Sequence, residues 1–188
     1  MSGFEFTFGL ISLLLGLGFA HIAHCVARLV IQGRQVEWDW LSPLAALAVF
    51  ETTLIYWWYQ WSLRNDAVTM AEVGVRAFAC LILYVMAVAV LPEGGQTEER
   101  VSLKAHFERS RRLIFGALIA YYTVVALIPP LLRALRGEGS WGYLASNVLS
   151  MSLFVLAFAI PKRWVSALVL LYLVAIEAVI WLFESITA

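Results

Sequence analysis

The chain has 188 residues, of which 62% are hydrophobic and only 14% are charged, and its formal net charge is zero. Soluble domains are about half apolar and about a quarter charged, so this composition excludes an ordinary soluble domain. The mean hydropathy of +0.84 likewise indicates apolar surroundings. We therefore expect the lipid bilayer to be the main partner of the chain, and we expect no nucleic-acid partner.

The apolar residues form six long runs separated by short connectors. A helix rises about 1.5 Å per residue, so about 20 apolar residues cross a hydrocarbon layer about 30 Å thick. Barrel strands alternate apolar and polar residues, whereas these runs are apolar on every face. The sequence predicts an all-α polytopic bundle of six transmembrane helices, with residues 1–188 as a single membrane domain. The predicted spans are residues 6–31, 41–63, 73–91, 113–132, 141–160 and 164–183.

The first span carries three ionisable side chains, His21, His24 and Arg28, at positions i, i+3 and i+7 of one helical face. Ionisable groups inside a bilayer are costly unless protein shelters them. A neighbouring stripe of small residues would let another helix approach closely. We therefore predict that this face of the first span is buried against protein. The stripe consists of Gly16, Ala20, Ala23 and Ala27.

Two carboxylates also fall inside predicted spans, Glu51 in the second and Glu177 in the sixth. Together with His21 they lie within about 10 Å of one another in depth, at about 1.5 Å per residue. In one interpretation this cluster is a proton relay or a cation pathway, because imidazole and carboxyl groups exchange protons. In the other, His21 pairs with Glu51 only to specify helix packing. Glu177 then pairs with Asn147, Ser150 or a tyrosine.

The connector at residues 92–112 is the longest between two spans, and it is rich in basic residues. Basic segments next to a membrane attract anionic headgroups of the cytoplasmic leaflet. We expect this segment to bind anionic lipid or a cytosolic partner. Its candidate binding residues are Lys104, Arg109, Arg111 and Arg112.

Pro129 and Pro130 fall near the outer end of the fourth span. Proline has no backbone N–H, so two donors are lost from the helix at this point. A kink or a re-entrant end is expected there.

The distribution of lysine and arginine predicts the orientation, because basic residues are in excess in cytoplasmic connectors. Nine of the thirteen basic residues lie in or beside the first, third and fifth connectors, and four lie on the other side. Both termini are thus predicted to be periplasmic. The nine are Arg28, Arg34, Arg100, Lys104, Arg109, Arg111, Arg112, Lys162 and Arg163; the four are Arg64, Arg76, Arg133 and Arg136.

The sequence gives little indication of a cofactor, a metal or catalysis. His21 and His24 are spaced so that both could reach one ion, but Glu51 would have to serve as the third ligand. One helix cannot supply both axial ligands of a haem. P-loop, GxGxxG, HExxH and GxSxG patterns are absent from the sequence. We expect no cofactor, no bound metal and no catalytic residues.

Residues 33–41 and 137–144 are similar, and each segment leads into the middle span of its half of the chain. With three spans in each half, a duplication would give the 3+3 inverted repeat found in many transporters. Chance similarity between apolar segments is the alternative interpretation.

Residues 16–30 read Gly-Leu-Gly-Phe-Ala-His-Ile-Ala-His-Cys-Val-Ala-Arg-Leu-Val, and residues 56–61 read Tyr-Trp-Trp-Tyr-Gln-Trp. This pattern resembles a family of small bacterial multi-pass membrane proteins that carry a small-residue run, a histidine and an Arg-Leu pair in the first span. The resemblance covers roughly the first third of the chain. It implies a bacterial inner-membrane location and points to His21 and Arg28, and it brings no assigned activity.

These features predict a small proton- or cation-linked channel or transporter with a His/Glu cluster at mid-membrane. A homo-oligomer is expected, because six short spans enclose little volume alone. The alternative is a non-transporting membrane subunit or a scaffold that binds lipid or a partner. A membrane enzyme acting on lipid is a third class, for which the sequence shows no paired nucleophile and base.

Overall fold

The structure, a computed structural model, describes residues 3–64, 69–93, 100–135, 137 and 141–187. Within these ranges the chain is almost entirely helical, as the sequence predicts. Its helices are α1 (Gly3–Gln32), α2 (Leu41–Ser62), α3 (Met70–Val90), α4 (Leu103–Tyr122), α5 (Ile128–Leu135), α6 (Trp141–Ala159) and α7 (Arg163–Thr187). The remaining elements are the short 3-10 helix η1 (Gly33–Gln35), the strands β1 (Val36–Glu37) and β2 (Val101–Ser102), and the π-helical segment η2 (Thr123–Leu127).

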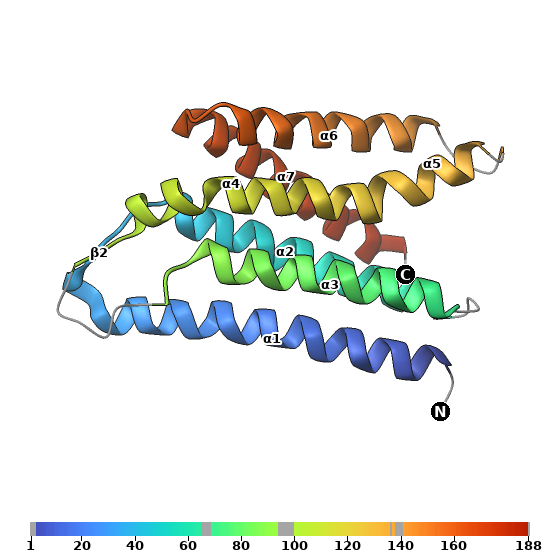
Figure 1. Cartoon of the computed structure of the whole chain (residues 1–188), viewed down its shortest axis with the longest axis horizontal. Coiled ribbons are helices and arrows are strands. Elements are labelled where there is room, and N and C mark those ends of the chain that lie inside the picture. Colours follow the sequence, from blue (N-terminus) through green and yellow to red (C-terminus); the bar gives the residue numbers. More distant parts are fainter. Residues whose placement is uncertain (1–2, 65–68, 94–99, 136, 138–140, 188) are drawn as a thin grey trace.

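Five of the described helices are long and apolar enough to cross a membrane. A sixth helix, Leu144–Ala159, is also apolar but shorter. Figure 1 shows the long helices lying roughly along one direction, with α1 at one edge, α6 at the other and α2, α3, α4 and α7 between them. The helix starts and ends agree closely with the predicted spans, apart from the fourth. There α4 begins at Leu103, ten residues before the apolar run that predicted it.

One face of α1 packs along α3. Its buried positions repeat at alternating intervals of four and three residues, which is the spacing of a helix that lies along another helix. At Gly18 an added Cβ would lie 3.5 Å from the Ala87 Cβ, so the two backbones approach closely at this position. The buried positions of α1 along this seam are Ile11, Leu15, Gly18, Ile22, Cys25 and Leu29.

The first, third and fifth connectors meet at one end of the bundle, opposite to the two termini (Figure 1). There β1 and β2 pair in parallel, with Val36 opposite Val101. The Ser42 hydroxyl at the start of α2 donates to the Leu103 carbonyl, 3.0 Å away, at the start of α4. These contacts join two connectors that are more than 60 residues apart in the sequence, because Ser42 and Leu103 are separated by 61 positions.

Two prolines interrupt the regular hydrogen bonding of the fourth span, as expected. In an α-helix the missing N–H of Pro130 would have bonded to the Ala126 carbonyl. The structure has the π-helical segment η2 just before the prolines, and α5 continues beyond them in a changed direction (Figure 1). Asn147 of α6 donates its Nδ2 hydrogen to the Ala126 carbonyl at 2.8 Å. A side chain from a neighbouring helix thus replaces the donor that proline lacks.

Replacing Asn147 by leucine should lower the free energy of unfolding by about 1–2 kcal/mol, because the Ala126 carbonyl loses its donor inside the bundle. Thermal unfolding in detergent, followed by tryptophan fluorescence, measures the change. The matched control is Ser152→Ala, since this exposed hydroxyl bonds only to the backbone of its own helix, at Val148. Equal melting temperatures for the two variants would show that Asn147 does not support η2.

Candidate functional site

A buried carboxylic acid joins α2 to α7. Glu177 is 3% exposed and Thr52 is 2% exposed, and the Thr52 hydroxyl oxygen lies 2.6 Å from Glu177 Oε1. The same hydroxyl oxygen lies 2.8 Å from the Ala48 carbonyl, one turn earlier in α2. The two side chains come from segments 125 residues apart in the sequence, so this contact forms only when the bundle closes.

The Thr52 hydroxyl has a single proton and cannot donate fully in both of these contacts at once. Both are complete hydrogen bonds when Glu177 is protonated and donates to Thr52, while Thr52 donates to Ala48. A neutral Glu177 also avoids the large cost of placing an unpaired charge in an apolar interior. The geometry therefore favours a carboxylic acid that holds a proton inside the bundle.

A second carboxyl group lies next to this pair. Glu51 precedes Thr52 in α2 and is half-buried, so it lies beside the residue that bonds to Glu177. One oxygen of each carboxyl group, Oε2 in both cases, is buried and has no hydrogen-bond partner among the described residues. Two neighbouring acids with unused acceptor oxygens can bind a proton or a small cation.

The ionisable residues of α1 lie elsewhere. His21 is half-buried, and its Nε2 lies 3.4 Å from the Cys25 sulfur. His24 is exposed and Arg28 is half-buried. Among the described contacts, none joins these three side chains to Glu51 or to Glu177. The structure thus brings the two carboxyl groups together but does not bring His21 to them.

Two of the three partners that the purely structural interpretation gives to Glu177, namely Asn147 and Ser150, are not bonded to it. Glu177 bonds to Thr52 and not to Asn147 or Ser150, since Asn147 donates to Ala126 and Ser150 bonds to the Tyr172 hydroxyl at 2.9 Å. The expected His21 to Glu51 pair is likewise not among the hydrogen bonds of the described residues. The reason is that α1 turns its apolar seam, and not its polar face, toward the bundle.

The small-residue face of α1, which is predicted to be buried against protein, is not covered by the other helices of this chain. This face lies beside the seam with α3 and points away from the neighbouring helices. All four small residues, Gly16, Ala20, Ala23 and Ala27, are exposed.

The basic residues predicted to bind lipid or a partner divide into two groups. Arg111 is only 7% exposed, because it lies on the face of α4 that packs into the bundle. Its Nη1 donates to carbonyls at the end of α6: to Ala157, to Phe158 at 3.2 Å and to Ile160 at 3.1 Å. A cation at a helix C-terminus satisfies carbonyls that have no partner in the helix. The other three, Lys104, Arg109 and Arg112, are exposed.

An ion pair ties the fifth connector to the first. Arg163 Nη2 lies 2.5 Å from Asp39 Oδ1, and its Nη1 lies 3.7 Å from Glu108 Oε1 in α4. We name this end of the bundle the connector clamp. It comprises the β1–β2 pairing, the Ser42 bond to Leu103, the Arg163 ion pairs and the Arg111 bonds to α6.

The sequence contained a signal for Arg111 but not for Thr52. Leu103, Phe107, Arg111, Ile114 and Leu118 are all buried and follow helical spacing, so Arg111 belongs to an apolar face and not to a solvated one. Thr52 lies in an apolar run with no pattern that distinguishes it from Thr53. Only the packing of α7 on α2 selects Thr52 as the partner of Glu177.

The described residues include no group of three or more His, Cys, Asp or Glu side chains that could hold a metal ion. Comparisons with protein-family models, with curated proteins and with solved structures give no match. The functional assignment of this chain therefore rests on its own residues.

Proposed function

We propose that this chain is a six-span protein of the bacterial inner membrane, with both termini in the periplasm, and that it conducts or carries protons or a small cation. The observation that carries the proposal is Glu177, a carboxylic acid 3% exposed in the bundle and bonded to Thr52. Ionisable groups inside membrane bundles typically mark ion or proton pathways. The half-buried Glu51 beside it offers a second position for the transported ion.

Self-assembly is part of this proposal, as is the sidedness given by the basic connectors. Six short spans enclose little volume, so a pathway shared between copies is favoured over one inside a single copy. The end that bears the excess of Lys and Arg would face the cytoplasm.

Proton flux into vesicles tests the proposal. Purified protein is reconstituted into liposomes that contain a pH-sensitive dye, and a pH gradient is imposed across the membrane. The wild type should dissipate the gradient faster than empty vesicles. Glu177→Gln should reduce the flux to the level of empty vesicles, because glutamine keeps the size and the hydrogen bonding of a neutral glutamic acid but cannot release a proton. Glu51→Gln should reduce it in part.

The matched control is Glu37→Gln, because Glu37 is exposed in β1 at the connector end. This variant should conduct like the wild type. Sodium and potassium gradients in the same vesicles distinguish proton from cation movement. A wild type no faster than empty vesicles for all three ions would refute the transport proposal, as would full activity in the Glu177→Gln variant.

A second candidate function is a membrane scaffold that holds anionic lipid or a cytosolic partner. It is favoured by the exposed basic side chains of α4 at the connector end: Lys104, Arg109 and Arg112. Reversing all three charges to glutamate should abolish recovery of a cytosolic partner and binding to vesicles with anionic lipid. Unchanged binding in both assays would contradict this candidate.

A further inference from the structure

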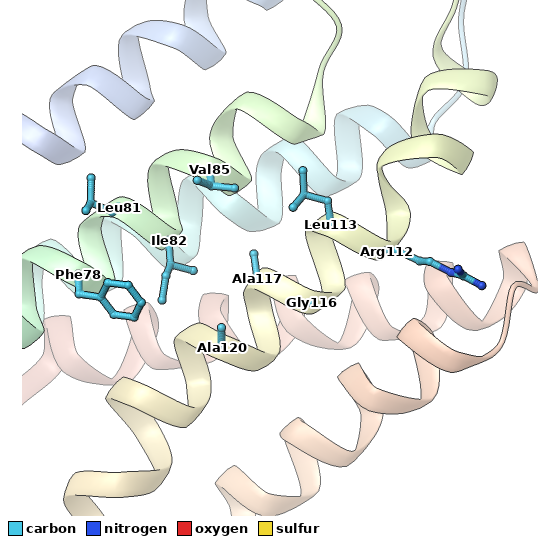
Figure 2. A pocket seen from close by; sticks show the side chains of 9 residues that line it. All are labelled: Phe78, Leu81, Ile82, Val85, Arg112, Leu113, Gly116, Ala117 and Ala120. Carbon is cyan, nitrogen blue, oxygen red and sulfur yellow. The ribbon is translucent and has the colours of Figure 1, made fainter.

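A groove of about 280 Å³ runs between α3 and α4 on the outside of the bundle. Figure 2 shows Phe78, Leu81, Ile82 and Val85 of α3 on one side of it. These residues follow the spacing i, i+3, i+4 and i+7, so they form one stripe along the helix. One face of α3 thus forms this side of the groove.

The α4 side of the groove has the same spacing and smaller side chains. Leu113, Gly116, Ala117 and Ala120 line it, and the two alanines leave space that larger residues would fill. Seven residues of helix extend over about 10 Å, so the groove is long enough to hold part of an extended hydrocarbon chain. Its apolar lining excludes a polar solute as the occupant of this part.

One charged residue, Arg112, lies at the end of the groove. Figure 2 shows its side chain extending away from the apolar residues. The structure pairs it with no carboxylate among the described residues, and Glu108, one turn earlier, is directed to Arg163 instead. Arg109 is exposed on the same face of α4, one turn before Arg112. A guanidinium without a partner is available for an anion.

The position of Arg112 along the bundle fits a phosphate group. Its neighbour Arg111 binds the carbonyls at the end of α6, so this level of α4 coincides with the end of an apolar helix. Spans end where hydrocarbon gives way to headgroups, so Arg112 lies where lipid phosphates lie. Arginine also matches the geometry of phosphate oxygens with paired N–H donors.

We propose that the groove between α3 and α4 is a binding site for an anionic phospholipid, with one acyl chain between the two helices and the phosphate on Arg112. This proposal rests on the proposed membrane location of α3 and α4 and is independent of ion transport. The positive charge of Arg112 favours a lipid with net negative charge. The narrow space beside the small side chains of α4 favours an unbranched acyl chain.

Native mass spectrometry of the detergent-solubilised protein tests the site. The protein is mixed with equal amounts of phosphatidylglycerol and phosphatidylcholine that have the same acyl chains, and the first bound lipid is identified. We expect phosphatidylglycerol to be in excess. Arg112→Gln should reduce this excess roughly fivefold, the value for one basic side chain at an anionic surface. The control Arg34→Gln, which removes an exposed charge of η1 outside the groove, should leave the excess unchanged.

Filling the groove should have a different effect. Ala120→Leu should reduce the first bound lipid of both kinds, whereas Ala145→Leu, at an exposed position of α6, should not. Leu81→Trp fills the groove from an exposed position and serves if Ala120→Leu fails to fold. Equal binding of the two lipids to the wild type, or equal effects of Arg112→Gln and Arg34→Gln, would overturn the proposal. Failure of the wild type to float with liposomes would instead contradict the membrane location.

Discussion

Replacing Arg111 by methionine is expected to reduce the free energy of unfolding by about 2–3 kcal/mol. The reason is that three carbonyls at the end of α6 lose a charged donor in a buried position. Methionine retains much of the length and packing of the arginine side chain, so the loss reports mainly on the hydrogen bonds. Thermal unfolding of the purified protein in detergent, monitored by tryptophan fluorescence, measures it.

The matched control is Arg112→Met, since Arg112 is the next residue in the chain and is exposed. It should melt within a degree or two of the wild type, because exposed positions away from special features change stability little. Arg111→Lys should lie between the two, since an ammonium supplies a charge but not the fork of guanidinium donors. If Arg111→Met and Arg112→Met have the same melting temperature, the Arg111 bonds to α6 do not stabilise the protein.

A pair of substitutions at Thr52 and Glu177 is expected to separate stability from transport. Thr52→Val alone should reduce the free energy of unfolding by about 1–3 kcal/mol, because the buried carboxyl group loses its only hydrogen-bond partner among the described residues. The double variant Thr52→Val/Glu177→Leu should recover most of that loss. Two apolar groups of similar shape can replace a buried polar pair at little cost.

The same double variant should show no ion flux in the vesicle assay, since its carboxyl group is gone. Recovered stability without flux would show that Glu177 is retained for transport and not for packing. A double variant as unstable as Thr52→Val alone would favour a structural role for the pair. Thr53→Val provides the control, because the Thr53 hydroxyl bonds only to the Val49 carbonyl of its own helix, at 2.6 Å.

The helices could be predicted from the sequence because each long apolar run is read directly from the residues, and five of the described helices are long and apolar enough to cross a membrane. The exception, the start of α4, has a physical cause. Residues 103–112 are too polar to extend an apolar run, yet Leu103, Phe107 and Arg111 lie on one buried helical face. A search for helical spacing within the connector, and not only for mean hydropathy, would have found this extension.

The site was predicted only in part. The cost of carboxylates inside a membrane points to Glu51 and Glu177, and the structure places Glu51 beside Thr52, the partner of Glu177. Only its depth places His21 with them, and depth does not determine the direction in which a side chain points. The residues of α1 are mostly apolar on every face of the helix. Hydropathy therefore does not show that its seam toward α3 passes through Ile22 and Cys25 rather than through His21.

The Asp39–Arg163 ion pair also bears on how the chain is made. Synthesis proceeds from the N-terminus, so Asp39 leaves the ribosome 124 residues before its partner. Until Arg163 has been synthesised and α7 has packed, the first connector carries an acid without its counter-ion. A nascent chain interrupted before Arg163 would therefore be distinguishable from a finished one by its open, protease-accessible first connector.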